Sequence, residues 1–390
     1  MIFSTMSQRH LDSILNRAGV EHPLSYHEIL YLLSLKDAEQ INKVMLAARK
    51  LREKYFGKKV FLYGFIYFST YCRNLCTFCY YRKENQLSPR YRKSPEEVIE
   101  IALRLAESGV HLVDLTMGED PAIHNTGNYD ILVDMIDRVK ESTGLPVMVS
   151  PGVVPEDVLQ RFGEVDANWY ALYQETHNPN LYKKLRVGQS FEERSAKRSA
   201  ARRAGMLVED GIMLGVGENT SDRADSVLAM KRDNADQVRV MSLVPQPQTP
   251  FEGKVTPERI SEYLFIAVMR LVMPDRLIPA SLDVDGIKGL KMRLAAGANV
   301  VTSIIPPDSS LAGVSQSTLD IEQGLRTVPE VKKVLADLGL QVADVGEYMN
   351  WMTARKELKA AKEDCHDENR YYRGAAAGFG SSVPGSTGQI

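Results

Sequence analysis

The composition of the 390-residue chain is that of a globular protein: 44% of its residues are hydrophobic, 25% are charged, and the formal net charge is −2. Such a chain can bury a large core, and its balanced charge does not favour nucleic acid or an anionic membrane as a partner. The first residues lack the pattern of a secretory signal, and no apolar run approaches the length of a bilayer span. We therefore expect a cytoplasmic protein with no membrane segment.

The N-terminal region is predicted to be helical. Residues 26–56 carry apolar side chains at helical spacing, and the pattern stops at Gly57, where a helix would end. Two amphipathic helices are expected here, within an N-terminal extension that covers residues 1–57.

From residue 58 on, short β-branched or aromatic runs alternate with charged segments of helical spacing. The expected strands are "VFLYGFIYF" (60–68), "HLVDLTM" (111–117), "PVMVS" (146–150), "NWYALYQ" (168–174), "EDGIMLGV" (209–216), "DQVRVMSLV" (236–244), "LIPASLD" (277–283) and "ANVVTSII" (298–305). The expected helices between them include 94–108, 128–142, 190–204, 221–234 and 256–273. This alternation predicts an α/β fold, and eight such units over residues 58–345 fit a closed (β/α)8 TIM barrel. An open doubly wound sheet is the alternative, because a count of strands does not establish closure.

Residues 346–390 are expected to form a third region. It begins with a helical pattern, "VGEYMNWMTARKELKAAKED" (345–364), and ends with "RGAAAGFGSSVPGSTGQI" (373–390). The second stretch is rich in Gly, Ser and Ala, which predicts a flexible, disordered tail outside the fold.

Three of the four cysteines lie in "STYCRNLCTFCYYR" (69–82), directly after the first expected strand. So few cysteines, clustered in one place, argue against a disulfide framework and favour a reducing compartment. Cys72, Cys76 and Cys79 can converge on one small inorganic centre, whereas a structural zinc site would want four ligands. The fourth cysteine, Cys365, is near the tail and is expected to be a bystander. A [4Fe-4S] cluster on three thiolates leaves one iron open to bind a ligand, which is a catalytic arrangement.

The spacing of these cysteines, with an aromatic residue before the last one, resembles the signature of the radical S-adenosylmethionine (SAM) enzymes. The resemblance implies a barrel that holds a [4Fe-4S] cluster and SAM. "MGED" (117–120) resembles the family segment that holds the SAM amino group, which implies a contact from Glu119, although Met117 replaces a glycine. The resemblance also implies contacts from Tyr80 and, to the SAM carboxylate, from Arg194. Without the motif, Arg194 would be taken for a solvated surface residue.

Four residues at the ends of expected strands are further candidates for holding SAM. Ser150 and Glu175 follow the third and fourth strands, at the end of a barrel where active sites form, and their hydroxyl and carboxylate groups can hold a ribose. Glu175 could instead cap the next turn. Gly215 and Gly217, after the fifth strand, would let the backbone approach adenine, although such a pair also suits a simple turn.

Longer stretches, spread over about residues 25–340, resemble the methylornithine synthases of the pyrrolysine pathway; among them are "FIYFSTYC", "VDLTMGEDP", "YQETH", "LRVGQSF" and "GANVVTSIIP". That family implies an isomerase that uses a 5′-deoxyadenosyl radical to convert L-lysine to (3R)-3-methyl-D-ornithine. It also implies an electron donor such as ferredoxin or flavodoxin. The alternative enzyme is a biotin-synthase-like or hydrogenase-maturase-like one that acts on another small molecule. Sulfur insertion is disfavoured because the sequence has no second cysteine cluster.

Charged residues inside the expected strands give evidence about the substrate that does not depend on the family resemblance. Asp114 and Arg239 lie among apolar residues, and Asp283 ends the seventh strand. Buried charges are costly unless they are paired, so these three either neutralise one another or receive a charged ligand. An arginine for a carboxylate and two aspartates for two ammonium groups match a diamino acid such as L-lysine. Ser281 shares a strand face with Asp283 and can assist. The resemblance points to the same four residues.

A zinc knuckle or an electron relay, the rival classes, would have little use for such charges.

Overall fold

The structure is a computed structural model, and it describes residues 2–313 and 325–358. One compact unit runs from Met1 to Asp344, and a second begins at Val345. In the second, residues 345–358 are helical, in agreement with the pattern of the sequence there. Cys365 and the glycine-rich tail lie outside the described residues.

The described residues form nine β-strands, and all eight expected strands are among them. The strands are β1 (Lys59–Ser69), β2 (Leu112–Met117), β3 (Val147–Ser150), β4 (Trp169–Ala171), β5 (Leu207–Leu214), β6 (Gln237–Ser242), β7 (Pro279–Ser281), β8 (Val300–Ile304) and β9 (Gln341–Val342). The order in the sheet is β6-β5-β4-β3-β2-β1-β8-β7, and the neighbouring strands are parallel. The short β9 was not expected; it pairs with the first residues of β1.

The sheet closes between its two outer strands. An isolated parallel bridge joins Gln237 of β6 to Leu277, just before β7. Its backbone hydrogen bonds run from Val238 N to Leu277 O (3.0 Å) and from Leu277 N to Asp236 O (3.1 Å). The expected barrel is therefore confirmed, and the open-sheet alternative is excluded. We call this junction the β6/β7 seam.

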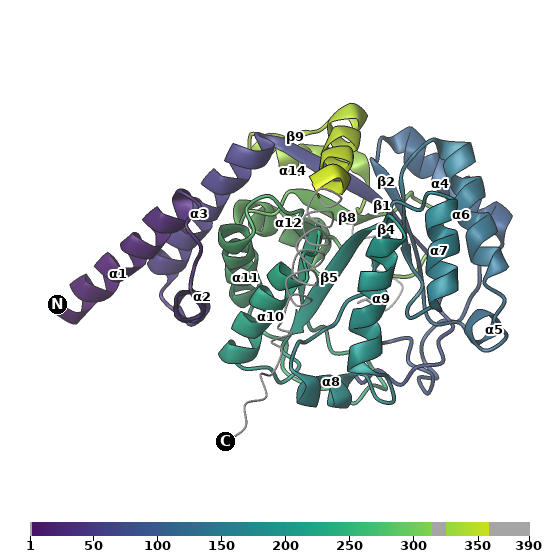
Figure 1. Ribbon diagram of the computed structural model, residues 1–390, viewed down its shortest axis with the longest axis horizontal. Coiled ribbons are helices and arrows are strands. Elements are labelled where there is room, and N and C mark those ends of the chain that lie inside the picture. Colours follow the sequence, from purple (N-terminus) through teal and green to yellow (C-terminus); the bar gives the residue numbers. More distant parts are fainter. Residues whose placement is uncertain (1, 314–324, 359–390) are drawn as a thin grey trace, which may run out of the picture. The chain divides into compact units, whose positions relative to one another are not determined.

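Helices surround the strands, as Figure 1 shows. They are α1 (Ile2–Gly19), α2 (Tyr26–Leu33), α3 (Ala38–Phe56), α4 (Pro95–Ser108), α5 (Pro121–His124), α6 (Asp130–Thr143), α7 (Glu156–Glu164), α8 (Pro179–Leu185), α9 (Phe191–Arg203), α10 (Thr220–Arg232), α11 (Arg259–Val272), α12 (Gly286–Ala295) and α14 (Val328–Asp337). Each of the five helices expected between the strands is present. Within the described residues, no helix combines the length and apolar character needed to cross a membrane.

Helix α4 illustrates why the boundaries fall where they do. The Ser94 side chain accepts the backbone N–H of Glu97, the Glu97 carboxylate accepts the N–H of Ser94, and Pro95 occupies the first turn. This capping box satisfies backbone donors that a helix start leaves without partners. The helix ends at Gly109, whose φ of +89° is a left-handed conformation that glycine adopts without strain.

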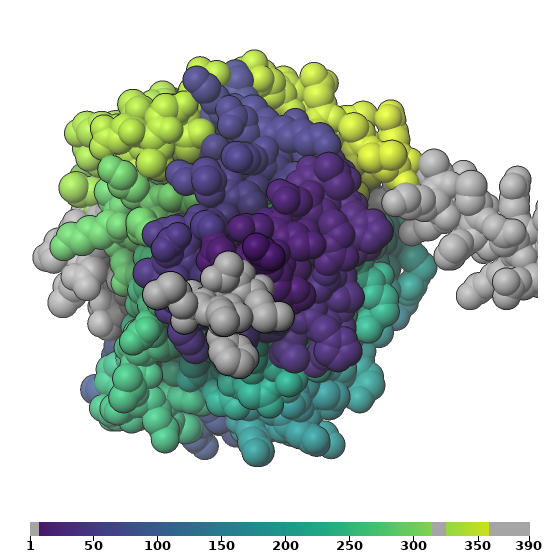
Figure 2. Space-filling model, turned by 90° about the vertical axis from the view of Figure 1, so that its left-hand side faces the viewer, coloured from purple at the N-terminus to yellow at the C-terminus, as the bar shows by residue number. Residues whose placement is uncertain are grey.

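The N-terminal helices cover one side of the barrel. α2 and α3 are the two expected amphipathic helices, whereas α1 was not expected. α3 packs against α11, and α2 packs against α10. Figure 2 shows this face, with the purple N-terminal helices lying over the green part of the barrel. The N-terminal helices therefore extend the layer of helices outside the barrel.

Candidate active site

The three cysteines that follow β1 line a single cavity of about 160 Å³, which we call the thiol cavity. Residues at or just after the carboxyl ends of β2, β3 and β4 also line it: Glu119, Ser150 and Glu175. These loops meet because parallel strands place all their carboxyl ends at the same end of a barrel, where barrel enzymes carry their active sites. The structure thus brings together residues that lie about a hundred positions apart in the sequence.

Two side chains from outside the cysteine loop donate hydrogen bonds to Cys76. Gln189 Nε2 lies 3.1 Å and Arg186 Nη1 lies 3.6 Å from the Cys76 Sγ atom. Arg186 also pairs with Glu175, with 2.5 Å between Nη2 and Oε1, and its guanidinium lies over the Phe78 ring. Glu175 therefore faces a cation rather than capping the next turn.

Burial disfavours the ionised form of two thiols of the loop. Burial raises the pKa of the Cys72 thiol to about 11, and burial together with the other two cysteines raises that of Cys79 still further. Coordination to a metal ionises such thiols outright. Among the described residues, no three His, Cys, Asp or Glu side chains gather closely enough to hold a single metal ion. The cysteines line a shared space instead, which fits a cluster with one thiolate on each of three irons.

Gly118 lets the end of β2 approach the cysteine loop. A Cβ atom at this position would lie 2.3 Å from the Tyr71 carbonyl oxygen. The next residue, Glu119, accepts the Val153 N–H at 3.0 Å and the Arg73 Nε–H at 3.0 Å. Burial acts to raise the pKa of Glu119, but the amide of Val153 and the nearby cations hold it below its usual value. Glu119 is therefore an ionised acceptor beside the thiols.

Arg194 lies on α9 and also lines the thiol cavity. It is only 4% exposed, and its Nε atom donates to the Tyr173 carbonyl oxygen at 2.6 Å. Burial, with the neighbouring Arg186 charge, lowers the pKa of Arg194 to about 10. The residue is thus a buried cation inside the site rather than a solvated surface arginine.

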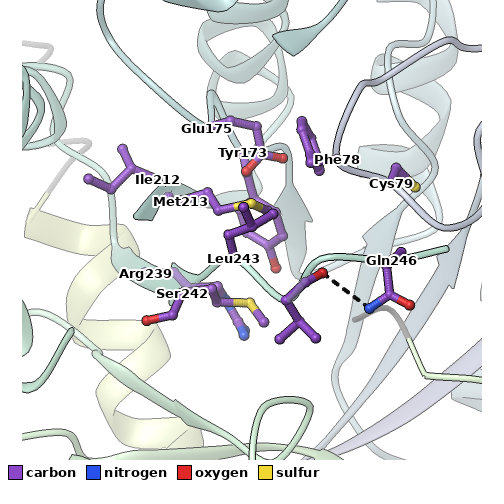
Figure 3. A pocket seen from close by; sticks show the side chains of 13 residues that line it. Phe78, Cys79, Tyr173, Glu175, Ile212, Met213, Arg239, Ser242, Leu243 and Gln246 are labelled. Carbon is purple, nitrogen blue, oxygen red and sulfur yellow. Dashed lines mark hydrogen bonds between the residues drawn. The ribbon is translucent and has the colours of Figure 1, made fainter. Parts of the chain in front are cut away.

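A second cavity, the inner cavity, adjoins the thiol cavity and reaches into the barrel. Phe78, Cys79, Tyr173 and Glu175 line both cavities. Figure 3 shows the inner cavity, with Phe78 and Cys79 on one side of the view and Arg239 on the other. Its remaining walls are mostly apolar and come from β5, β6 and the residues after β6.

Arg239 in the inner cavity is held by a buried carboxylate. Its Nε atom donates to Glu209 Oε1 at 2.7 Å, and its Nη1 donates to the Thr302 hydroxyl at 3.2 Å. The guanidinium lies over the Tyr173 ring, 5.3 Å from the centroid, and the Tyr173 hydroxyl donates to the other Glu209 oxygen at 3.0 Å. Gly211 provides the space for the Arg239 side chain, because a Cβ atom at position 211 would lie 2.9 Å from the Arg239 Cβ atom.

Asp114 has hydroxyl donors and no adjacent cation among its hydrogen-bond partners in the described part of the chain. Thr116 Oγ1 donates to Asp114 Oδ1 at 2.9 Å, and Ser150 Oγ donates to the same atom at 3.1 Å. Burial, followed by the charge of Glu209, raises the pKa of Asp114 to about 7. Ser150 thereby links the thiol cavity to the charged interior of the barrel.

Asp283 forms a buried ion pair with Arg326, with 2.8 Å between Oδ1 and Nη1. Ser281 Oγ accepts the Asp283 N–H at 3.2 Å. The expectation that Asp114, Arg239 and Asp283 neutralise one another or stay unpaired for a ligand needs correction. Arg239 and Asp283 are paired with other residues, because cross-strand and loop contacts supply partners that the strand sequences alone do not reveal.

Six predicted residues are absent from the lining of both cavities in the described part of the chain: Asp114, Ser281 and Asp283 of the proposed substrate site, and Tyr80, Gly215 and Gly217 of the proposed SAM site. Tyr80 donates its hydroxyl to the Leu87 carbonyl oxygen at 3.0 Å. Gly215 and Gly217 have φ angles of +86° and +108°, and the Gly215 N–H donates to the Glu218 carboxylate at 3.0 Å. The turn geometry at the two glycines accounts for their presence.

Sequence reasoning missed Glu209, Arg186 and Gln189. For Glu209 a signal was available, because it begins the apolar run 209–216 and is a charge in a buried strand like Asp114. Arg186 and Gln189 lie in "LRVGQSF", which contributed to the family resemblance, but the residue types of this loop segment do not by themselves mark the two side chains as part of a site.

Comparison with known proteins identifies the family to which this chain belongs. The sequence profile of the radical SAM superfamily matches residues 66–229. The 3-methylornithine synthase of Methanosarcina barkeri is 44% identical over 343 residues, which cover 88% of this chain and 97% of the relative. The chain belongs to the family of these 3-methylornithine synthases. A crystal structure of methylornithine synthase has 44% sequence identity and a TM-score of 0.83, and the match covers 87% of this chain and 99% of that one.

A more distant relative bears on the alternative activity. The [FeFe] hydrogenase maturase subunit HydE of Thermotoga maritima is 31% identical, over 69% of this chain and 77% of its own length. The higher identity and coverage of the methylornithine synthases confirm the resemblance predicted from the sequence and favour their activity over the alternative.

Proposed function

We propose that the protein is a radical SAM isomerase that converts L-lysine to (3R)-3-methyl-D-ornithine, the first step of pyrrolysine biosynthesis. The observation that carries this proposal is the joining of two cavities: one is lined by three cysteines, and the other contains a buried arginine. The first suits a cluster and its ligand, and the second suits a small charged substrate. The four residues that line both cavities, Phe78, Cys79, Tyr173 and Glu175, support the proposal of one shared reaction space.

Cys72, Cys76 and Cys79 would hold a [4Fe-4S] cluster. Glu119 would accept hydrogen bonds from the SAM ammonium, and Arg194 would pair with the SAM carboxylate, since both line the thiol cavity as buried charges. When bound, the cluster and SAM supply a 5′-deoxyadenosyl radical that removes a hydrogen atom from the substrate.

Other contacts with SAM are supported to different degrees. Ser150 and Glu175 line the thiol cavity, so their proposed contacts with the ribose rest on position. The proposed contacts of Tyr80, Gly215 and Gly217 rest on the family resemblance.

The substrate would lie in the barrel with its carboxylate at Arg239. Glu209, Thr302 and the Tyr173 ring hold that guanidinium in place, so it is oriented before a ligand arrives. The proposal that Asp114 and Asp283, with Ser281, receive the two ammonium groups rests on the family resemblance, since Asp283 is paired with Arg326 and none of the three lines either cavity within the described residues. The largely apolar wall of the inner cavity excludes water from the reacting carbons, which protects a radical from side reactions.

The cluster needs an electron from a low-potential carrier such as ferredoxin or flavodoxin, which we propose as the protein's partner in the cytoplasm. The alternative activity is that of another radical SAM enzyme, biotin-synthase-like or hydrogenase-maturase-like. It would place a different small molecule in the inner cavity.

The decisive experiment is anaerobic incubation of the reconstituted protein with SAM, dithionite and ¹³C-labelled L-lysine, with analysis of the products by mass spectrometry and NMR. We expect labelled 3-methylornithine. Norleucine, which lacks the terminal amine, should react far more slowly because it leaves a buried carboxylate without a partner. Cleavage of SAM without any methylornithine would contradict the assignment, and equal turnover of norleucine would contradict the charge-matched pocket.

A further inference from the structure

The segment between α8 and α9 supplies two hydrogen-bond donors to one cysteine sulfur. Gln189 Nε2 and Arg186 Nη1 both approach Cys76 Sγ, at 3.1 and 3.6 Å. Such N–H···S contacts from side chains are not needed to hold a cluster, because its protein ligands are the thiolates. Nothing in the proposed handling of SAM or lysine uses Gln189.

The two donors are held firmly in place. The Thr77 N–H in the cysteine loop donates to the Leu185 carbonyl oxygen at 2.9 Å, which ties the end of α8 to the loop. Arg186 is 8% exposed and is fixed further by its ion pair with Glu175. Gln189 Oε1 in turn accepts from Arg186 Nη1 at 3.3 Å. The donors therefore form one connected unit against the sulfur.

Hydrogen bonds to the sulfurs and nearby net charge are among the factors that set the reduction potential of an iron–sulfur cluster. Reduction adds one electron, supplied by a low-potential carrier or by dithionite, and breaks no bond. The added negative charge strengthens each N–H···S contact and the attraction to a buried guanidinium, since both act at low dielectric. Donors of this kind favour the reduced state and raise the potential.

We propose that Gln189 and Arg186 set the potential of the cluster by donating hydrogen bonds to Cys76, which makes the cluster easier to reduce. The inference rests on the proposed function, since it needs a cluster on the three cysteines. The two residues act by different means: Gln189 contributes a neutral hydrogen bond, and Arg186 adds a positive charge that also offsets Glu175.

The test is the midpoint potential of the reconstituted cluster, measured without SAM by dithionite titration monitored by electron paramagnetic resonance. Gln189→Met removes the donor at similar size and unchanged charge, and it should shift the midpoint to more negative values. Arg186→Met should shift it further in the same direction. The matched control is Lys184→Gln, which removes an exposed charge from the neighbouring helix and should leave the potential unchanged.

Iron content separates the possible failures. If wild-type protein forms no four-iron cluster, or forms one without the three cysteines, the proposed function fails. If the Gln189→Met protein holds a full cluster at the wild-type potential, only the present inference fails. Should Gln189→Met not hold a cluster, Gln189→Asn, whose shorter side chain cannot reach the sulfur, provides the same comparison. A shift in Lys184→Gln equal to that in Arg186→Met would mean that general charge is responsible, which would also overturn the role of the hydrogen bonds.

Discussion

At the scale of single residues, Asp114 shows how a folded environment changes a carboxyl group. The side chain is buried and accepts two hydroxyl donors, and its pKa is raised to about 7. A carboxyl group with that pKa is about half protonated at neutral pH, whereas an ordinary aspartate is fully ionised. An ammonium group beside it would favour the charged form. Substrate binding and ionisation of Asp114 are therefore coupled.

The coupling predicts a pH dependence with a definite sign. Because the pKa of Asp114 in the folded protein lies above its unfolded value, the folded state binds more protons between about pH 4 and about pH 7. The contribution of Asp114 to the free energy of unfolding is therefore fully present below about pH 4 and falls as pH rises through this window. Asp114→Asn should make the free energy of unfolding less dependent on pH, as urea denaturation from pH 5 to pH 8 can measure. Parallel pH profiles for the two proteins would contradict the raised pKa.

Glu209 and Arg239 are predicted to depend on each other. Removing one partner of a buried ion pair leaves the other charge uncompensated, so Glu209→Leu should lower the free energy of unfolding by about 3–5 kcal/mol. The double variant Glu209→Leu/Arg239→Met should recover much of that loss, because no uncompensated charge remains. Urea denaturation of the apoprotein tests this without any cofactor. If the loss of stability in the double variant equals the sum of the losses in Glu209→Leu and Arg239→Met alone, the two residues are not coupled as described.

At the scale of elements, the sequence predicted those features that rest on local patterns. The strands and the helices between them repeat a periodic signal over enough residues to be recognised. β9 was missed because it has two residues, which is too short for any period. α1 was missed although Leu11, Ile14 and Ala18 are buried at helical spacing, since that stretch was considered only as a possible signal segment.

The partners of the buried charges lie beyond local patterns. Arg239 pairs with a residue 30 positions away, and Asp283 with one 43 positions away. Which residues meet depends on strand register and loop paths. The sequence therefore indicated that Asp114, Arg239 and Asp283 are buried charges, but it did not reveal their hydrogen-bond and ion-pair partners. The thiols, Glu119 and Arg194 do line one cavity, and their grouping was implied by several separate motifs of the family resemblance rather than by local patterns.

The junction of β2 with the cysteine loop gives a prediction at this scale. In Gly118→Ala the new methyl group would meet the Tyr71 carbonyl, which must move, at a cost of about 1–3 kcal/mol. We expect a lower iron content after reconstitution while the barrel stays folded, as circular dichroism can verify. Gly19→Ala is the matched control, because nothing lies within 4 Å of its Cβ position. Full iron loading of Gly118→Ala would show that the close approach is not required.

At the scale of the whole molecule, the extent of hydrogen bonding between neighbouring strands varies around the barrel. β5 and β6 pair over six residues, whereas the β6/β7 seam rests on one isolated bridge. Gln237 at this seam is fully buried, and neither polar atom of its side chain has a hydrogen-bond partner within the described residues. Buried groups without partners are costly, so the seam is the weakest line of the closed sheet.

The seam runs between the strands that carry Arg239 and Ser281, so a substrate held by both would act as a cross-link between them. In hydrogen–deuterium exchange, the amides of Val238 and Leu277 should exchange faster than that of Leu243, whose N–H donates to the Leu214 carbonyl oxygen of β5 at 2.8 Å. Adding lysine to the loaded protein should slow exchange at the seam selectively. Uniform protection around the barrel would mean that the substrate stabilises the fold in general, and unchanged exchange at Leu277 would mean that it does not bridge the two strands. If exchange at the seam slows selectively, the substrate fastens a barrel that is already closed, and an empty enzyme would be most easily opened along the line where its substrate binds.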